Sequence, residues 1–128
     1  MKTVSFDFDN TLWDEDMQSF IPETVALLRQ HQSEGNRIII VTSRVSQWIP
    51  EVHTLLNKLN LKLEVFCACG DPGWEIEGEL TKSQVLIAEG ASIHWDDLHE
   101  DACLQEAKKH GIEVLLPPNT KVEFPRMY

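Results

Sequence analysis

Short apolar runs alternate with helical segments along the chain, and this alternation limits the fold more than any other feature of the sequence. Several runs are continuously apolar, as strands are when helices cover both faces of their sheet. Strands separated by helices form parallel sheets with right-handed crossovers. The sequence therefore predicts a doubly wound α/β fold with a parallel five-stranded sheet, its strands at residues 4–8, 37–42, 61–67, 91–95 and 112–116.

The segments between these strands have recognisable helix ends. Pro22 suits the first turn of a helix, and Gly35 suits the position after its last turn. Ser46 and Thr81 are each placed to cap the start of a helix. The last helix is expected over residues 98–111, where a glycine again supplies the stop.

Length and charge narrow the classes of function. The 128 residues, 42% of them hydrophobic, suffice for one core, so residues 1–128 are expected to form a single domain. The sequence shows neither a membrane-spanning run nor a secretory signal, which predicts a cytoplasmic protein without a membrane partner. The net charge of −10 argues against extended nucleic-acid binding, because neutralising many phosphates needs clustered Lys and Arg. The three cysteines indicate reduced thiols, with a zinc site at Cys67 and Cys69 as the weaker alternative.

Reactive side chains stand at the carboxyl ends of the predicted strands, which is the edge where open parallel sheets bind their ligands. These residues are Asp7 and Asp9 from the first strand, Thr42, Ser43 and Arg44 from the second, and Asp96 and Asp97 from the fourth. Lys82 opens the helix before the fourth strand. Because side chains alternate along a strand, Asp7 and Asp9 are expected on one side and able to reach one pocket.

These segments resemble the four motifs of the haloacid dehalogenase superfamily of phosphohydrolases. "FDFDNT" resembles the Asp-x-Asp-x-Thr motif, "IIIVTS" the strand ending in Thr or Ser, "LTKSQV" the motif lysine, and "IHWDD" the acidic pair. The motifs occur in the family's order between residues 4 and 97. The resemblance implies the sheet order 3-2-1-4-5. Within the superfamily, "DFDNTLW" followed later by "SR" is similar to the small magnesium-dependent phosphatases that lack a cap domain. Neither gap between the motifs has room for such a domain.

The resemblance also implies a Mg²⁺-dependent phosphatase that works through an aspartyl-phosphate. The implied catalytic residues are Asp7, Asp9, Thr42 and Lys82, the candidate substrate contacts are Thr11, Ser43 and Arg44, and the implied Mg²⁺ ligands are Asp7, the carbonyl of Asp9, Asp96 and Asp97. Asp7 would be the nucleophile, with a pKa kept low by the metal. Asp9 would be the acid and then the base, with a higher pKa.

Two residue choices stay open. Ser43 is the alternative to Thr42 as the phosphate ligand, and Asp101 is the alternative to Asp97 as the second acidic residue. His94 lies within a strand and is expected to be a hydrogen-bonded core residue. The aromatic side chains expected to border the site are Trp13 and Trp74.

The absence of room for a cap domain affects which substrates and protein partners we expect. An uncovered site admits large phosphorylated substrates, such as a phosphoprotein or a nucleic-acid end, unless a neighbouring subunit of a homo-oligomer covers it. The alternative function is a non-catalytic phosphate-binding or phospho-acceptor module on the same fold, similar to response-regulator receivers. Receivers are phosphorylated after the third strand, where this chain has Cys67-Ala68-Cys69.

Overall fold

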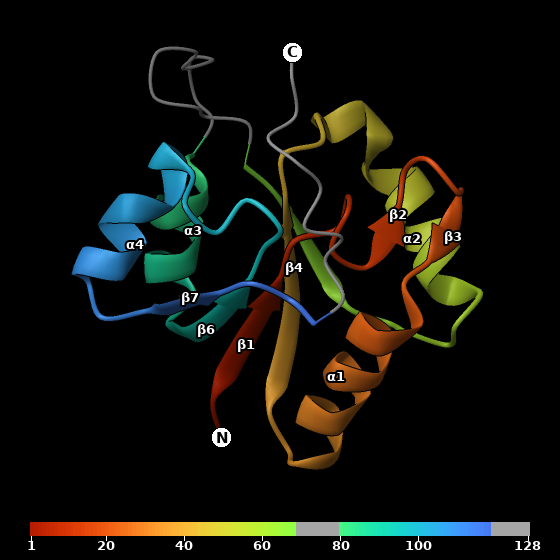
Figure 1. Ribbon diagram of the computed structural model, residues 1–128, viewed down its shortest axis with the longest axis horizontal. Coiled ribbons are helices and arrows are strands. Elements are labelled where there is room, and N and C mark those ends of the chain that lie inside the picture. The colour runs from red at the N-terminus through yellow and green to blue at the C-terminus, as the bar shows by residue number, and fades with distance from the viewer. Residues whose placement is uncertain (69–79, 119–128) are drawn as a thin grey trace.

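The computed structural model describes residues 1–68 and 80–118. Their main element is a five-stranded parallel sheet with the order β5-β4-β1-β6-β7 (Figure 1). Its strands are β1 (Thr3–Phe6), β4 (Arg37–Thr42), β5 (Glu64–Cys67), β6 (Ala91–Trp95) and β7 (Glu113–Leu115). The five predicted strands are confirmed, and so is the expected order 3-2-1-4-5.

Helices cover both faces of the sheet, as the apolar strands require. The helical elements are α1 (Pro22–Ser33), the 3₁₀ helix η1 (Ser46–Trp48), α2 (Ile49–Asn57), α3 (Lys82–Ala88), the 3₁₀ helix η2 (Ala102–Leu104) and α4 (Gln105–Lys109). In Figure 1, α3 and α4 lie to the left of the sheet and α1 and α2 to its right. Strand β4 serves both layers, because Ile38 and Ile40 join the core under α1 and α2 while Ile39 and Val41 join the core under α3 and α4.

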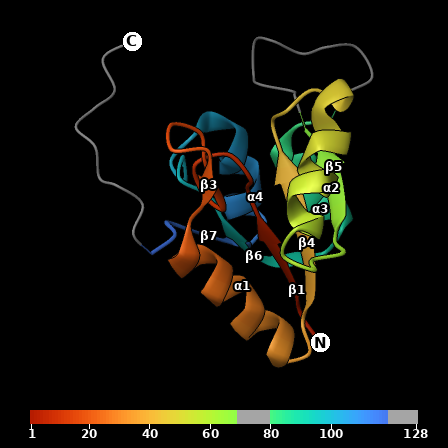
Figure 2. The ribbon, with the colours of Figure 1, turned by 90° about the vertical axis from the view of Figure 1, so that its right-hand side faces the viewer.

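A small antiparallel hairpin, β2 (Trp13–Asp14) with β3 (Ser19–Phe20), lies between β1 and α1 in the chain. Figure 2 shows this hairpin above α1, at the same end of the molecule as the carboxyl end of β1. Trp13 is buried, stacks on Phe8 at 6.3 Å between ring centroids and meets Phe20 edge-on at 5.0 Å. Trp13 therefore packs in the core beside the loop that carries Asp9, with which it forms an isolated bridge, and Trp74 lies outside the described residues.

Several predicted element ends need correction. Strand β5 begins at Glu64 instead of residue 61, and β7 spans Glu113–Leu115 instead of residues 112–116. Strand β1 ends at Phe6 instead of residue 8, because the carbonyl of Phe8 accepts hydrogen bonds from the amides of Leu12 and Trp13 and so closes a turn. The helix expected over residues 98–111 begins only at Ala102, as η2, and ends at Lys109. Its start is set by Asp101, whose carboxylate accepts a hydrogen bond from the amide of Cys103 at 3.0 Å.

The start of α3 has the capping that the sequence predicts. The amide of Gln84 donates to the Thr81 hydroxyl at 3.1 Å, and the amide of Thr81 donates to the Gln84 side chain at 2.9 Å. This reciprocal pair is a capping box, which defines the first turn of a helix. Lys82, the first residue of α3, is therefore held in a defined position. Ser46, in contrast, makes no such cap, because it lies inside η1.

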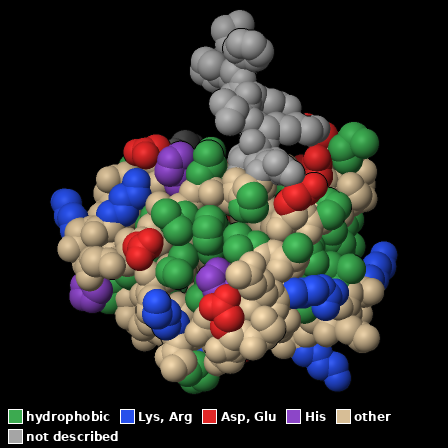
Figure 3. All heavy atoms as spheres, turned by 60° about the horizontal axis from the view of Figure 1, so that its bottom comes forward, with side chains coloured by type: hydrophobic (Ala, Val, Ile, Leu, Met, Phe, Trp, Pro, Cys, Tyr) green, Lys and Arg blue, Asp and Glu red, His purple; other side chains and the backbone are tan. Residues whose placement is uncertain are grey.

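The surface shows no concentration of acidic side chains on the face seen in Figure 3. Apolar side chains gather in the middle of this face, and the Asp and Glu side chains on it are scattered. The acidic excess of the chain is therefore not displayed as one patch there. Within the described ranges, no helix combines the length and the apolar character needed to cross a bilayer.

Candidate active site

Three carboxylates converge at the carboxyl ends of β1 and β6. Asp7, Asp96 and Asp97 each offer an oxygen atom, and these atoms lie within 4.8 Å of one another. The amide of Asp7 donates to the carbonyl of Trp95 at 2.9 Å, which extends the pairing of the two strands beyond β1. Asp7 and Asp96 are buried, with 5% and 1% of their surface exposed. The sheet thus brings together the acidic residues that the sequence placed after two separate strands.

Lys82 balances part of this negative charge. Its ammonium donates to Asp7 Oδ1 at 3.1 Å and to Asp96 Oδ2 at 2.8 Å. Burial alone would lower the pKa of Lys82, but the charges of Asp7 and Asp96 raise it above its ordinary value, so the side chain is cationic. One ammonium cannot neutralise three ionised carboxylates. Oxygen ligands with excess negative charge are the donor set that Mg²⁺ prefers, so these residues fit a bound Mg²⁺.

The pKa values show how unfavourable this crowding is for the chain alone. Burial raises the pKa of Asp7 well above its ordinary value, and the neighbouring Asp96 and Asp97 raise it further despite the opposing charge of Lys82. Burial also raises the pKa of Asp97. Asp96 differs, because the hydrogen bond from His94 and the charge of Lys82 outweigh its burial and lower its pKa. In the chain alone, the folded structure thus favours the ionised form of Asp96 and disfavours the ionised form of Asp7.

Asp9 is held by Arg44 in a bidentate ion pair. Arg44 donates through Nε to Asp9 Oδ2 and through a terminal nitrogen to Asp9 Oδ1, both at 2.8 Å. The same guanidinium contacts Glu15 at 3.1 Å and lies 5.2 Å from the centre of the Phe8 ring. Arg44, a candidate substrate contact, is therefore engaged with carboxylates of the chain itself.

In the chain alone, this ion pair places the pKa of Asp9 below its ordinary value, whereas the pKa of Asp7 lies above its ordinary value. Burial raises the pKa of Asp9, but the hydrogen bonds and charge of Arg44, together with the charge of Lys82, bring it below its ordinary value. The expectation of a lower pKa at Asp7 and a higher one at Asp9 refers to the metal-bound site and stays a prediction. The two pKa values differ because Arg44 neutralises Asp9, whereas Asp7 shares the ammonium of Lys82 with Asp96.

Thr11 connects the two acidic loops. Its hydroxyl lies 3.2 Å from Asp7 Oδ2 and 3.4 Å from Asp97 Oδ1, and it accepts a hydrogen bond from the amide of Asp97 at 3.1 Å. The side chain is completely buried. Thr11, expected as a candidate substrate contact, is thus placed to orient the carboxylates.

The two candidate phosphate ligands after β4 lie in different environments. Thr42 is completely buried, and its hydroxyl accepts a hydrogen bond from the amide of Arg44 at 3.1 Å. Ser43 is exposed. A substrate that approaches from solvent therefore reaches Ser43 more directly than Thr42.

The choice between Asp97 and Asp101 is clearer. Asp97 belongs to the carboxylate cluster, whereas Asp101 caps η2.

Cys67 donates a hydrogen bond from its thiol to the carbonyl of Arg44 at 2.9 Å, and Cys69, its partner in the zinc alternative, lies outside the described residues.

His94 lies beside the carboxylate cluster and is hydrogen-bonded to both Asp96 and Ser5. His94 is completely buried, with Nε2 at 2.9 Å from Asp96 Oδ2 and Nδ1 at 2.8 Å from the hydroxyl of Ser5. The expectation of a hydrogen-bonded core histidine is confirmed. Its contact with Asp96 was missed, although the two residues are two positions apart and so share a side of an extended chain.

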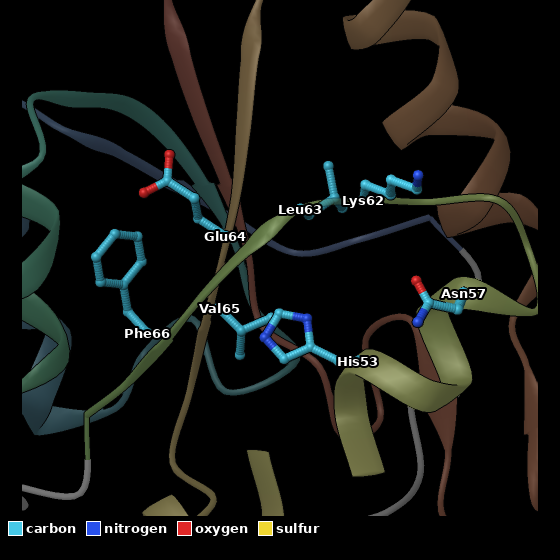
Figure 4. Close-up of a pocket in the computed structure, with 7 residues that line it drawn as sticks. All are labelled: His53, Asn57, Lys62, Leu63, Glu64, Val65 and Phe66. Carbon is cyan, nitrogen blue, oxygen red and sulfur yellow. The ribbon is translucent and has the colours of Figure 1, made fainter. Parts of the chain in front are cut away.

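An open depression of about 570 Å³ lies elsewhere, along the edge strand β5. It is lined by His53, Asn57, Lys62, Leu63, Glu64, Val65 and Phe66. In Figure 4, Val65 and Phe66 point to opposite sides of β5, with Val65 beside His53. No member of the carboxylate cluster lines this depression, so it is separate from the candidate site.

Solved structures share this fold at low sequence identity. A chain of the Pnkp1/Rnl/Hen1 complex matches with a TM-score of 0.68 and 14% identity, over 90% of this chain and 45% of that one. This chain thus spans less than half of that relative's length. The D,D-heptose 1,7-bisphosphate phosphatase from B. bronchiseptica, crystallised with magnesium and phosphate, matches with a TM-score of 0.61 and 12% identity, over 91% of this chain and 80% of that one.

No curated protein matches the chain by sequence. The sequence model of one protein family, the haloacid dehalogenase-like hydrolases, matches residues 4–116 of the chain. That segment contains every residue of the carboxylate cluster and Lys82. The chain therefore belongs to the haloacid dehalogenase-like hydrolases.

Proposed function

We propose that the protein is a Mg²⁺-dependent phosphatase that hydrolyses a phosphomonoester through an aspartyl-phosphate, an acyl phosphate formed on Asp7. The observation that carries this proposal is the convergence of Asp7, Asp96 and Asp97 on one point beside the buried ammonium of Lys82. Membership of a hydrolase family supports it. The likeness in fold to a phosphatase crystallised with magnesium and phosphate is consistent with it.

Asp7, Asp96 and Asp97 would hold the metal through carboxylate oxygens, with the carbonyl of Asp9 as a further oxygen ligand. Bound Mg²⁺ supplies charge neutralisation for the carboxylates and withdraws negative charge from the phosphoryl group. Thr11 would keep Asp7 and Asp97 in position through the contacts of its buried hydroxyl.

In the first half of the reaction, a carboxylate oxygen of Asp7 attacks the phosphorus atom. A bond from Asp7 to phosphorus forms, the bond from phosphorus to the ester oxygen breaks, and the departing oxygen takes a proton from Asp9. In the second half, water attacks the same phosphorus atom and gives its proton to Asp9, and the bond to Asp7 breaks. The products are an alcohol and phosphate, and both aspartates return to their starting states. Two smaller barriers thus replace one large barrier.

Asp9 cannot carry a proton easily while Arg44 holds both of its oxygens. We propose that phosphoryl oxygens of the substrate attract Arg44 and so release Asp9. The exposed Ser43 is better placed than the buried Thr42 to contact the phosphoryl group directly, and Thr42 would support the turn that carries Arg44. Lys82 would bind a phosphoryl oxygen and offset the charge of Asp7.

The substrate is proposed to be able to exceed metabolite size. Between β1 and β4 the described chain forms only the β2–β3 hairpin and α1, with no inserted domain. A site without a cap leaves room for a phosphorylated macromolecule, or for a second subunit that covers it.

The decisive test is hydrolysis of an aryl phosphate by the purified chain. We expect phosphate release with Mg²⁺ and none after a chelator has removed the metal, because the carboxylates alone repel the anionic substrate. Acid-quenched protein should contain an acyl phosphate on Asp7 that mass spectrometry detects. Full activity in chelator would refute the proposal. Phosphate binding without turnover would instead favour the non-catalytic module.

A matched pair of substitutions tests which acidic residue binds the metal. Asp97→Asn should weaken Mg²⁺ binding by about tenfold or more, because a ligand matters at least as much as its hydrogen-bonding partners. Asp101→Asn should leave Mg²⁺ binding and stability near the wild-type values, because asparagine caps a helix as well as aspartate does. Calorimetric titration with Mg²⁺ measures both affinities. The reverse ranking of the two variants would exclude Asp97 as the ligand.

A further inference from the structure

A buried chain of hydrogen bonds runs from the middle of the sheet to the carboxylate cluster. Ser5 on β1 and His94 on β6 are paired neighbours across the two strands, and both are completely buried. His94 Nδ1 lies 2.8 Å from the hydroxyl of Ser5, and His94 Nε2 lies 2.9 Å from Asp96 Oδ2. His94 thus contacts a proposed metal ligand from the side away from solvent.

The partners of the ring determine which nitrogen carries the proton. An ionised carboxylate can only accept hydrogen bonds, so Nε2 must donate to Asp96. A completely buried imidazole favours its neutral form, which leaves Nδ1 as an acceptor for the hydroxyl proton of Ser5. Ser5 therefore selects the one neutral tautomer that can donate to Asp96.

These contacts hold Asp96 in one orientation. Asp96 Oδ2 receives hydrogen bonds from His94 and from Lys82, and Oδ1 receives one from the amide of Leu98 at 2.9 Å. The three donors come from β6, from α3 and from the segment that follows β6. Rotation of the carboxylate would break at least one of these buried hydrogen bonds, which is costly in a site without solvent.

Packing alone does not explain a serine and a histidine at these two positions. An apolar pair would fill the same space without the cost of removing polar groups from water. His31 is different from His94, because neither of its ring nitrogens is hydrogen-bonded and its ring lies against Phe6 and Trp95.

We propose that His94, held in one tautomer by Ser5, is a positioning residue that orients Asp96 for Mg²⁺. This inference rests on the proposed function, because it takes Asp96 as a metal ligand. Carboxylate ligands of metals are commonly held by such hydrogen-bonding partners, and losing one typically costs about 10–100-fold in metal affinity. The histidine would therefore act on the metal without touching the substrate.

The test compares variants that keep or remove the donor at Nε2. A glutamine amide nitrogen can take the place of Nε2, whereas the shorter asparagine amide reaches only the place of Nδ1. We expect His94→Asn and His94→Phe to raise the Kd for Mg²⁺ by about 10–100-fold and His94→Gln to stay within a few-fold of wild type. Ser5→Ala should weaken binding in the same direction, but less. His31→Phe, the control at a half-buried histidine without hydrogen-bonded ring nitrogens, should not change the Kd.

The measurement is calorimetric Mg²⁺ titration of the substrate-free proteins, together with Mn²⁺ titration followed by electron paramagnetic resonance. Thermal denaturation in chelator checks that each variant is folded, and Ser5→Ala and His94→Gln keep the comparison decisive if His94→Phe does not fold. Equal Mg²⁺ affinity of wild type and folded His94→Asn, or equal losses in the asparagine and glutamine variants, would overturn the inference while the proposed phosphatase stands. Wild-type binding with the expected ranking, but no hydrolysis of aryl phosphate, would refute the proposed function and leave the metal-positioning role intact. A wild-type chain that binds neither ion would overturn both.

Discussion

Asp7→Asn is expected to abolish phosphoryl transfer and at the same time to stabilise the metal-free chain. The asparagine amide cannot form the acyl phosphate, so turnover should fall by about 10⁴-fold or more, the scale seen when other enzymes lose a nucleophile. The stabilisation follows from the raised pKa of Asp7, which means that folding opposes its ionisation in a buried site beside Asp96 and Asp97. Acid-quench trapping of the phosphoenzyme and thermal denaturation in chelator measure the two effects.

The stabilisation has a defined dependence on pH. A carboxyl group with a raised pKa in the folded state supports folding in its protonated form, and this support is lost as the pH rises through the raised value. The stability difference between Asp7→Asn and wild type should therefore be small in acid and widen as the pH rises. Asp9 and Asp96, whose lowered pKa values act in the opposite sense, are present in both proteins.

Asp16→Asn on the exposed β2–β3 hairpin is the matched control, and it should alter neither turnover nor the melting temperature. Accumulation of phosphoenzyme in Asp7→Asn would show that another residue is the nucleophile. A lower melting temperature in chelator would show that the ion pair with Lys82 outweighs the cost of burying the charge.

Lys82→Met should be the most destabilising single change at the site when no metal is present. Its ammonium is the cation that contacts both Asp7 and Asp96 in the buried cluster, and a buried pair that loses one partner typically costs about 3–5 kcal/mol. Denaturant unfolding in chelator at neutral pH measures the loss. Mg²⁺ should restore part of it, because a divalent cation can neutralise the same carboxylates. Hydrolysis should still fail, since the group proposed to bind the phosphoryl oxygen is missing.

A double variant separates this electrostatic cost from lost packing. In an Asp7→Asn background, Lys82→Met should cost less, because fewer uncompensated carboxylates remain. Lys109→Met is the matched surface control, since Lys109 is 74% exposed and its ion pair with Glu106 should contribute no more than about 1 kcal/mol. A Lys82→Met protein as stable as wild type in chelator would contradict the assignment of Lys82 as the neutralising cation.

The sequence by itself determined the arrangement of the sheet and most of its helices. Strand β4 appears at residues 37–42 as predicted, and Thr81 caps α3 as predicted, because burial along a strand and capping of a helix depend on neighbouring residues. The parallel order then follows from the alternation of strands and helices. The same order brings the ends of β1 and β6 together, so the cluster of Asp7, Asp96 and Asp97 was also within reach of the sequence.

The partners of the acidic residues were decided only by the tertiary structure. Arg44 and Asp9 are 35 residues apart, and no local pattern indicates that the arginine neutralises this aspartate instead of waiting for substrate. The start of the last helix likewise depends on one capping contact, in which Asp101 accepts a hydrogen bond from the amide of Cys103. The neighbouring residues in the sequence do not predict this contact.

The pairing of Ser5 with His94 shows most clearly what sequence patterns leave open. The two residues are 89 positions apart, and their contact depends on an irregularity in the register between β1 and β6. Thr3 pairs with Ala91 but Val4 pairs with Ile93, so one extra residue of β6 is accommodated before His94. Without that shift, Ser5 would face Ile93, because a slip of one residue exchanges the sides of all following side chains. The sequence supplied the serine, the histidine and the aspartate, and the register of two strands connected them.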